Sequence, residues 1–240
     1  MTHSISYNGH DFSPYVAAEL VEPCGHVVEP RTLAVPGRAG AALLGGEVPP
    51  RVLRVRLFLD AGLQLADSAR SGIRHELYGW LLAPEGGELV VPGDPGMTYK
   101  DAVCTDASDW SSLFEDGSCE LAFTCYDPYG YGEAKSSTGT ALSVGGTKAT
   151  WPTTSLTAVA GDSGKVTDSG TGLYVLVERT FSEGDSVVVD FVAETVRVNG
   201  EDASADVSVA SDFFALEPGA HVLAFSGCSA HVVSWVERWA

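Results

Sequence analysis

The chain has 240 residues and a mass of 25.1 kDa, enough for one large or two small domains whose core needs no disulfide or metal. Hydrophobic residues make up 45% of it and charged residues 19%, which is a globular composition rather than a disordered one. The formal net charge of −18 repels phosphate and anionic lipid over most of the surface. These values disfavour a nucleic-acid-binding or membrane-binding role.

Compartment and redox state follow from the termini and the cysteines. No apolar run approaches the roughly 20 residues that cross a bilayer, and MTHSISYNGHDF lacks the basic-then-apolar pattern of a signal peptide. We therefore expect a soluble protein made and kept in a cytoplasm until assembly or release. The five cysteines form no C-x-x-C pair and no zinc spacing, and buried reduced thiols are expected at Cys24, Cys104, Cys119, Cys125 and Cys228.

The first element along the chain is the segment 33–50, LAVPGRAGAALLGGEVPP, which has little means of forming its own core. Its Gly-Gly and Pro-Pro pairs favour a protruding hairpin or arm. Leu43 and Leu44, if exposed on such an arm, would be a liability for a monomer and useful for a partner contact. Two interpretations stay open, a partner-binding arm and a loop folded back on its own domain.

A strand is predicted over residues 52–59, because Leu53, Val55, Leu57 and Leu59 share one face of an extended chain and the arginines between them take the other. A second strand is predicted over residues 119–125 from the same alternation. Between them, apolar residues at three- and four-residue steps predict one amphipathic helix over 67–83, which Pro84 ends. Its apolar residues are Ala69, Ile73, Leu77, Trp80 and Leu81.

The segment DPYGYGEAKSSTGT at 127–140 is the best linker, and it places a domain boundary near Gly132. Beyond it, short strands are predicted at 156–160, 173–178, 187–192 and 221–225, separated by segments whose residues are typical of turns. This spacing favours a β-sandwich. The expected fold is mainly β, with an N-terminal β-sandwich or split-barrel domain (1–132) that carries the helix and a C-terminal β-sandwich (133–240), whose last strand is able to return toward the first domain.

Basic residues gather near the arm, since five of the eight in the first part of this acidic chain lie between positions 31 and 56. Such a patch suits an acidic surface on an identical neighbour. The residues predicted to contact another subunit are Val35, Pro36, Arg38, Leu43, Leu44, Arg51, Arg54 and Arg56, with Arg31 completing the basic group.

No motif predicts catalysis, a cofactor or a metal. Gly161-Asp162-Ser163-Gly164 imitates the nucleophile segment of trypsin-like proteases, but Lys165 stands where those enzymes need glycine, so a hairpin turn is expected. The spacing of a phosphate-binding loop is missing, and the six histidines are scattered. Aromatic residues of the second half leave one alternative function, a carbohydrate-binding module in which sugar would stack on Trp151, Trp235 or Trp239.

Several strings, taken in order, resemble the distal tail protein family of long, flexible-tailed bacteriophages (siphophages), and the likeness covers most of the chain. Two of them are fairly specific, the Tyr-Asp-Pro-Tyr at 126–129 and the Asp-Phe-Phe-x-Leu-x-Pro-Gly at 212–219. The strings are VPGRAGAALLGG (35–46), LRVRLFL (53–59), LYGWLLAP (77–84), LVVPGDPGMTYKDAVCTDASDWSSLFEDGSCELAFTCYDPYGYG (89–132), VVVDFVAETVRVNG (187–200) and DFFALEPGAHVLAF (212–225).

This resemblance implies a structural protein of the virion tail tip rather than an enzyme. It implies a ring, usually of six copies, that joins the tail tube protein to the tail-associated adhesin or baseplate protein and leaves a channel for DNA. The N-terminal domain would build the ring, the segment 33–50 would clasp the adjacent subunit, and the C-terminal sandwich would be galectin-like. No large carbohydrate-binding insertion is present, and neither a membrane nor a specific nucleic-acid sequence is an expected partner.

Overall fold

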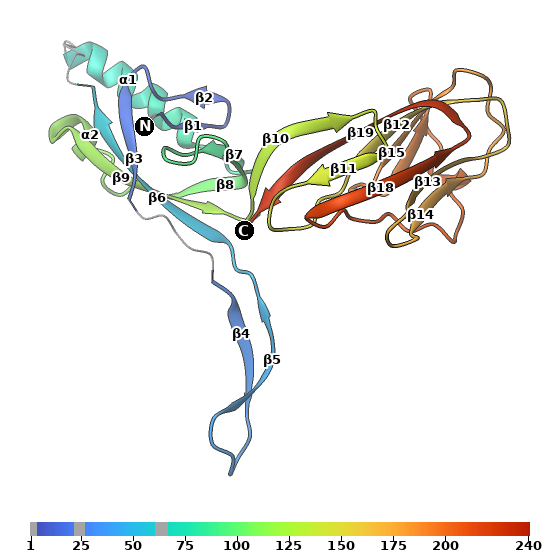
Figure 1. The fold of residues 1–240 in the computed structure, drawn as a ribbon. Coiled ribbons are helices and arrows are strands. Elements are labelled where there is room, and N and C mark those ends of the chain that lie inside the picture. The colour runs from blue at the N-terminus through green and yellow to red at the C-terminus, as the bar shows by residue number, and fades with distance from the viewer. Residues whose placement is uncertain (1–3, 22–26, 61–66) are drawn as a thin grey trace. The chain divides into compact units, whose positions relative to one another are not determined.

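The computed structural model describes residues 4–21, 27–60 and 67–240 (Figure 1). It divides into two compact units, with the boundary between Tyr131 and Gly132. We call them the N-terminal unit and the C-terminal unit and describe each by itself. In the part of the chain that the structure describes, no helix has the length and apolar character needed to cross a membrane.

The N-terminal unit is built on one open antiparallel sheet with the strand order β2-β1-β7-β8-β9-β6-β3. A separate two-stranded sheet, β4 with β5, and two helices complete it. The strands are β1 (Ser6–Tyr7), β2 (His10–Asp11), β3 (Val16–Leu20), β4 (Glu29–Ala34), β5 (Ala41–Glu47), β6 (Arg51–Leu59), β7 (Gly87–Val90), β8 (Thr98–Asp106) and β9 (Ser118–Cys125), and the helices are α1 (Asp67–Leu81) and α2 (Ser112–Glu115).

Both strands that alternation predicts in this unit are confirmed. Along β6, buried and exposed residues alternate without interruption from Arg51 to Phe58. Strand β9 pairs with it in a register that sets Leu53 opposite Phe123 and Val55 opposite Leu121, all four buried. Because side chains of neighbouring strands lie side by side on one face, this pairing forms the centre of the N-terminal core.

Helix α1 covers this core with its C-terminal half. Leu77 and Leu81 are buried and Trp80 packs partly buried against the same cluster, whereas Ala69 is exposed. The helix ends at Leu81, two residues before the predicted end, since proline at position 84 disfavours helical geometry in the residue before it. The predicted helix is therefore correct in type and position and slightly too long.

The thiols that the structure describes are free, and those of β9 are buried as predicted. Cys119 and Cys125 are no more than 5% exposed, and burial raises the pKa of each to about 12. Cys104 and Cys228 are only partly buried, which corrects the expectation for these two, and Cys24 lies outside the described residues.

We expect Cys119 and Cys125 to resist iodoacetamide in the folded protein at pH 8, because only the thiolate attacks and both thiols are protonated and covered. Mass spectrometry of labelled peptides measures this. Prior unfolding in guanidinium should make both react fully. Labelling of either one in the native protein within minutes would contradict the buried environment.

The C-terminal unit is a sandwich of two antiparallel sheets, as predicted. One sheet runs β17-β16-β15-β12-β19-β10 and the other runs β11-β18-β13-β14. The strands are β10 (Gly130–Ser137), β11 (Ala141–Val144), β12 (Thr153–Ala158), β13 (Gly164–Asp168), β14 (Tyr174–Val177), β15 (Ser186–Asp190), β16 (Thr195–Val198), β17 (Glu201–Asp202), β18 (Gly219–Ser226) and β19 (Cys228–Trp239), with a 3-10 turn η1 (Ser204–Asp206).

Two local features differ from the sequence expectations. The strand predicted to reach residue 192 ends at Asp190, because that carboxylate accepts the backbone N–H groups of Val192 and Ala193 and closes a turn. The Gly161–Gly164 segment is not a hairpin turn. It connects β12 of one sheet to β13 of the other, and Ser163 lies exposed within it.

Candidate interaction surfaces

The segment predicted as an arm forms the hairpin β4–β5, which we call the arm hairpin (residues 29–47). At its tip, the N–H of Arg38 donates to the carbonyl of Val35 at 3.1 Å, and Gly37 has a φ of 81°. A proline at the second position and a left-handed glycine at the third are typical of a type II turn. The tip is therefore a preorganised Pro-Gly turn with Arg38 as its last residue.

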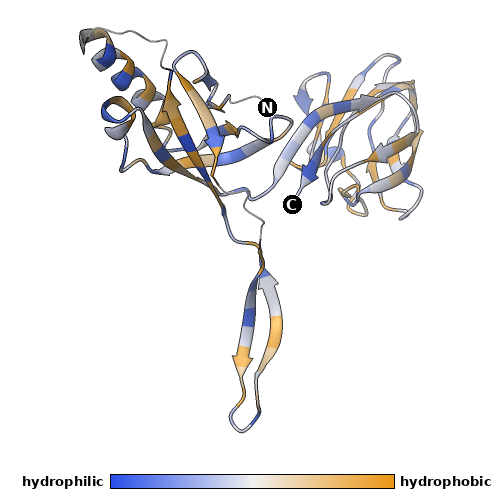
Figure 2. Ribbon diagram, turned by 60° about the vertical axis from the view of Figure 1, so that its left-hand side comes forward, coloured by the Kyte–Doolittle hydropathy of each residue, from blue (hydrophilic) through white to orange (hydrophobic). Residues whose placement is uncertain are grey.

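The arm hairpin packs on neither core. No residue from 27 to 50 is buried, and both hydrophobic clusters lie outside this range. Leu43 and Leu44 are 71% and 66% exposed, and Leu33 on the facing strand is 53% exposed. Figure 2 shows apolar colour on both strands. Of the residues predicted to contact another subunit, Val35, Pro36, Arg38, Leu43 and Leu44 lie together on this element.

An isolated two-stranded sheet is marginally stable in water. The arm hairpin has some internal support, since the Arg31 guanidinium pairs with the Glu47 carboxylate and the Val28 side chain lies over Gly46. That ion pair is exposed and contributes less than about 1 kcal/mol. Exposed leucines on such an element gain free energy chiefly by contact with another surface.

The predicted basic patch does not gather on one surface. Arg54 and Arg56 project from the outer face of β6, and both contact the carboxylate of Glu120 on β9, at 3.5 and 3.3 Å. Their charges are thus partly balanced within the chain. Val52 and Phe58 flank them on the same strand and are 41% and 38% exposed. This outer face of β6 is a second candidate contact surface.

Arg51 corrects the predicted patch, because it lies on the buried face of β6 and is 7% exposed. Its guanidinium approaches the Tyr99 hydroxyl at 3.4 Å and lies 5.5 Å from the ring centre. That hydroxyl donates to the Asp94 carboxylate at 2.9 Å, and burial together with Asp94 raises the pKa of Tyr99 to about 12. The alternation along β6 predicts this burial, because Arg51 lies two residues before Leu53 and therefore on the same face of the strand.

The three candidate sugar-contact tryptophans do not form one platform. Trp235 is 7% exposed in the C-terminal core, so it offers no surface to a ligand, and the prediction for this residue is wrong. Trp151 is 38% exposed, and the Arg238 guanidinium lies 5.2 Å from its ring centre. Trp239 is 36% exposed. Sugar binding at Trp151 and Trp239 stays a prediction.

Residues of the types that hold metals do not converge in the described ranges, where no group of three His, Cys, Asp or Glu side chains could bind an ion. What the structure presents instead is exposed apolar side chains on the arm hairpin and on the outer face of β6.

The sequence and the fold of this chain are similar to those of known phage proteins. Residues 145–239 match the family model described as siphovirus-type tail component, C-terminal domain. This match covers most of the C-terminal unit. No curated protein matches the chain. Among solved structures, the SPP1 Dit protein, described as a paradigm of hub adsorption apparatus in phages that infect Gram-positive bacteria, is similar over 99% of each chain, with 19% identity and a TM-score of 0.80.

Chains of the phage P2 baseplate in its activated conformation are similar more distantly. The structure with Ca covers 92% of this chain and 90% of that one, with 7% identity and a TM-score of 0.52. The structure with Sr covers 90% of each, with 8% identity and the same TM-score. These matches confirm the resemblance to siphophage distal tail proteins and show that both units of this chain have the Dit fold.

Proposed function

We propose that the chain is a structural hub of a phage tail tip, which assembles as a ring of six copies and joins the tail tube to the adhesin or baseplate. The observation that carries this proposal is the arm hairpin, an exposed element whose leucines find no partner surface among the described residues of its own chain. Copies related by rotation present such an arm and its receiving surface to successive neighbours, and closure of that contact gives a ring.

The two units take different roles in this proposal. The N-terminal unit carries the arm hairpin and the outer face of β6, so it would form the ring. A net charge of −18 suits a channel that DNA crosses, since an acidic wall repels phosphate instead of retaining it. The role is one of contact without catalysis, and its partners would be other copies of this chain and proteins of the same tail tip.

Negative-stain imaging of the purified protein tests this proposal. We expect rings with a central opening and a mass of about six times 25.1 kDa, either for the protein alone or after addition of its tail neighbours. A protein that stays monomeric alone and with every tail component would contradict the proposal. Rings of another copy number would correct only the stoichiometry.

A further inference from the structure

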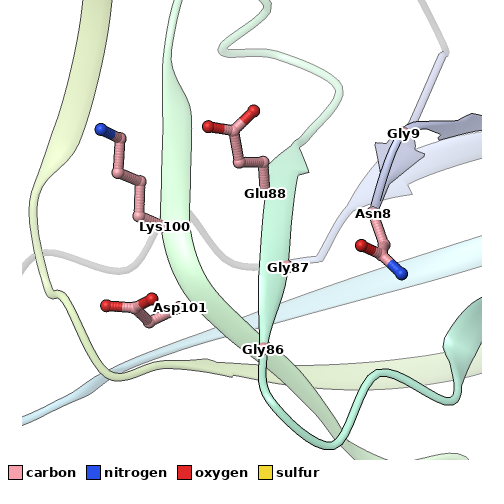
Figure 3. A pocket seen from close by; sticks show the side chains of 7 residues that line it. All are labelled: Asn8, Gly9, Gly86, Gly87, Glu88, Lys100 and Asp101. Carbon is pink, nitrogen blue, oxygen red and sulfur yellow. The ribbon is translucent and has the colours of Figure 1, made fainter. Parts of the chain in front are cut away.

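A pocket of about 510 Å³ opens on the N-terminal unit, where the β1–β2 turn meets the start of β7 and the middle of β8 (Figure 3). Three glycines line it without side chains, and the polar groups around them come from three strands or turns. Its lining residues are Asn8, Gly9, Gly86, Gly87, Glu88, Lys100 and Asp101.

The chain is closely packed beside this pocket. A Cβ added at Gly87 would lie 2.9 Å from the Cβ of Asn8, and one added at Gly86 would lie 3.1 Å from the Cα of Asp101. Both glycines therefore occupy positions where any side chain would push against a neighbouring segment. The two glycines thus allow the β1–β2 turn and β8 to approach β7 closely at the pocket wall.

The charged groups in the pocket lining are two carboxylates and one ammonium, and neither carboxylate has an ion-pair partner among the described residues. The carboxylates of Glu88 and Asp101 make no side-chain hydrogen bond or ion pair with the described residues. The Lys100 ammonium lies 4.2 Å from the ring centre of Tyr131, where the aromatic face attracts it. Two carboxylates and one ammonium in the pocket lining leave it with an excess of negative charge, which favours a cationic ligand, and a guanidinium pairs with carboxylates through several N–H groups at once.

The tip of the arm hairpin has the complementary properties. Arg38 is exposed and makes no ion pair within the described part of the chain, and its neighbours at the tip are the small residues Pro36, Gly37, Ala39 and Gly40. Strands of six and seven residues extend the tip by about 20 Å. A tip that carries one cation without an ion pair thus complements in charge a pocket whose lining carries two such carboxylates.

We infer that Arg38 at the arm tip of one copy binds between Glu88 and Asp101 in the pocket of a second copy. This inference rests on the proposed ring and names its contact. The leucines of the arm supply apolar burial, while the Arg38 contact fixes where the arm ends on its neighbour, as charged pairs do at interfaces.

Charge reversal tests the contact. Arg38→Glu and Glu88→Arg should each raise the concentration needed for half-assembly at least tenfold, because each places like charges together. Asp101 has a φ of 49°, which aspartate and asparagine tolerate better than arginine, so Asp101→Asn is the appropriate change there. Sedimentation velocity over a dilution series measures assembly. Arg70→Glu and Glu115→Arg make the same charge changes at other sites and serve as controls.

Mixing the two reversed proteins separates a contact between copies from one within a copy. In the mixture, the glutamate at the tip of the Arg38→Glu protein meets an arginine in the pocket of the Glu88→Arg protein. The Arg38 tip of the Glu88→Arg protein in turn meets the unchanged acidic pocket of the Arg38→Glu protein. Alternating copies should therefore assemble as the wild type does, whereas a contact within one chain would gain nothing from mixing. Assembly unchanged by Arg38→Glu, or a mixture that stays dissociated, would overturn the inference. Ring formation by the wild type would still support the proposed function in either case.

Discussion

Replacing both Leu43 and Leu44 with aspartate is expected to abolish assembly while both units stay folded. The two side chains are 71% and 66% exposed and belong to neither hydrophobic cluster of the described residues, so their loss costs the monomer little. If both are buried in the assembled state, each contributes about 1.5–3 kcal/mol to the contact. Losing both would weaken each contact by at least about a hundredfold, and a ring contains several such contacts.

Light scattering after size-exclusion chromatography measures the assembled mass, and circular dichroism reports the fold. Deletion of residues 36–49 should have the same effect, since the missing residues belong to the arm hairpin and its return to β6. Leu82→Asp, at an exposed leucine just after α1, is a matched control that should leave assembly intact. Aggregation or unfolding of the arm variants would show that the arm supports its own unit.

Glu237 is expected to be a polar side chain of the C-terminal unit whose loss costs substantial stability. Its side chain is 10% exposed, and its Oε1 accepts from the Lys135 ammonium at 2.5 Å and from the Gly145 N–H at 2.7 Å. Glu237→Ala leaves that N–H without its partner and creates a void beside it, so it should lower the free energy of unfolding by about 3 kcal/mol. Urea unfolding measures this, with Glu133→Gln on β10 as the more exposed control. A change below about 0.5 kcal/mol would contradict the role of the buried carboxylate.

The same carboxylate makes stability depend on pH. The Lys135 ammonium, more than the Gly145 N–H, holds the pKa of Glu237 below its ordinary value of 4.5. A group whose pKa is lower in the folded state stabilises the fold above the unfolded pKa, and this contribution is lost as the pH falls below about 4.5. The difference in stability between wild type and Glu237→Gln should therefore shrink as the pH is lowered from about 6 to about 3. A constant difference would contradict the assignment.

Alternation is sufficient to predict β6 and β9, because a strand with one buried face must repeat every two residues. The same alternation places Arg51 on the buried face of β6, whereas a count of nearby basic residues places it in an exposed patch. The prediction of an exposed Trp235 is wrong for a related reason, since composition does not show on which face of β19 an aromatic side chain lies. The connection at Gly161–Gly164 escapes prediction because turn chemistry identifies a reversal without specifying which sheet the next strand joins.

The pocket beside Gly86 and Gly87 could not be predicted from the sequence. It depends on segments that are far apart in the chain and on the register between β7 and β8, which shifts between Gly87 and Leu89. The arm hairpin is more accessible to prediction, because a segment with leucines, paired glycines and prolines has few ways to fold alone. In the proposed ring, what it contacts depends on surfaces of other copies.

Self-association of the purified wild-type protein tests the central claim most directly. Sedimentation velocity over a dilution series should show the 25.1 kDa chain giving way to one closed species of about six copies, without a ladder of larger sizes. The protein that carries both Leu43→Asp and Leu44→Asp should remain at the mass of one chain throughout. A wild type that stays monomeric at every concentration, alone and with tail components, would contradict the account.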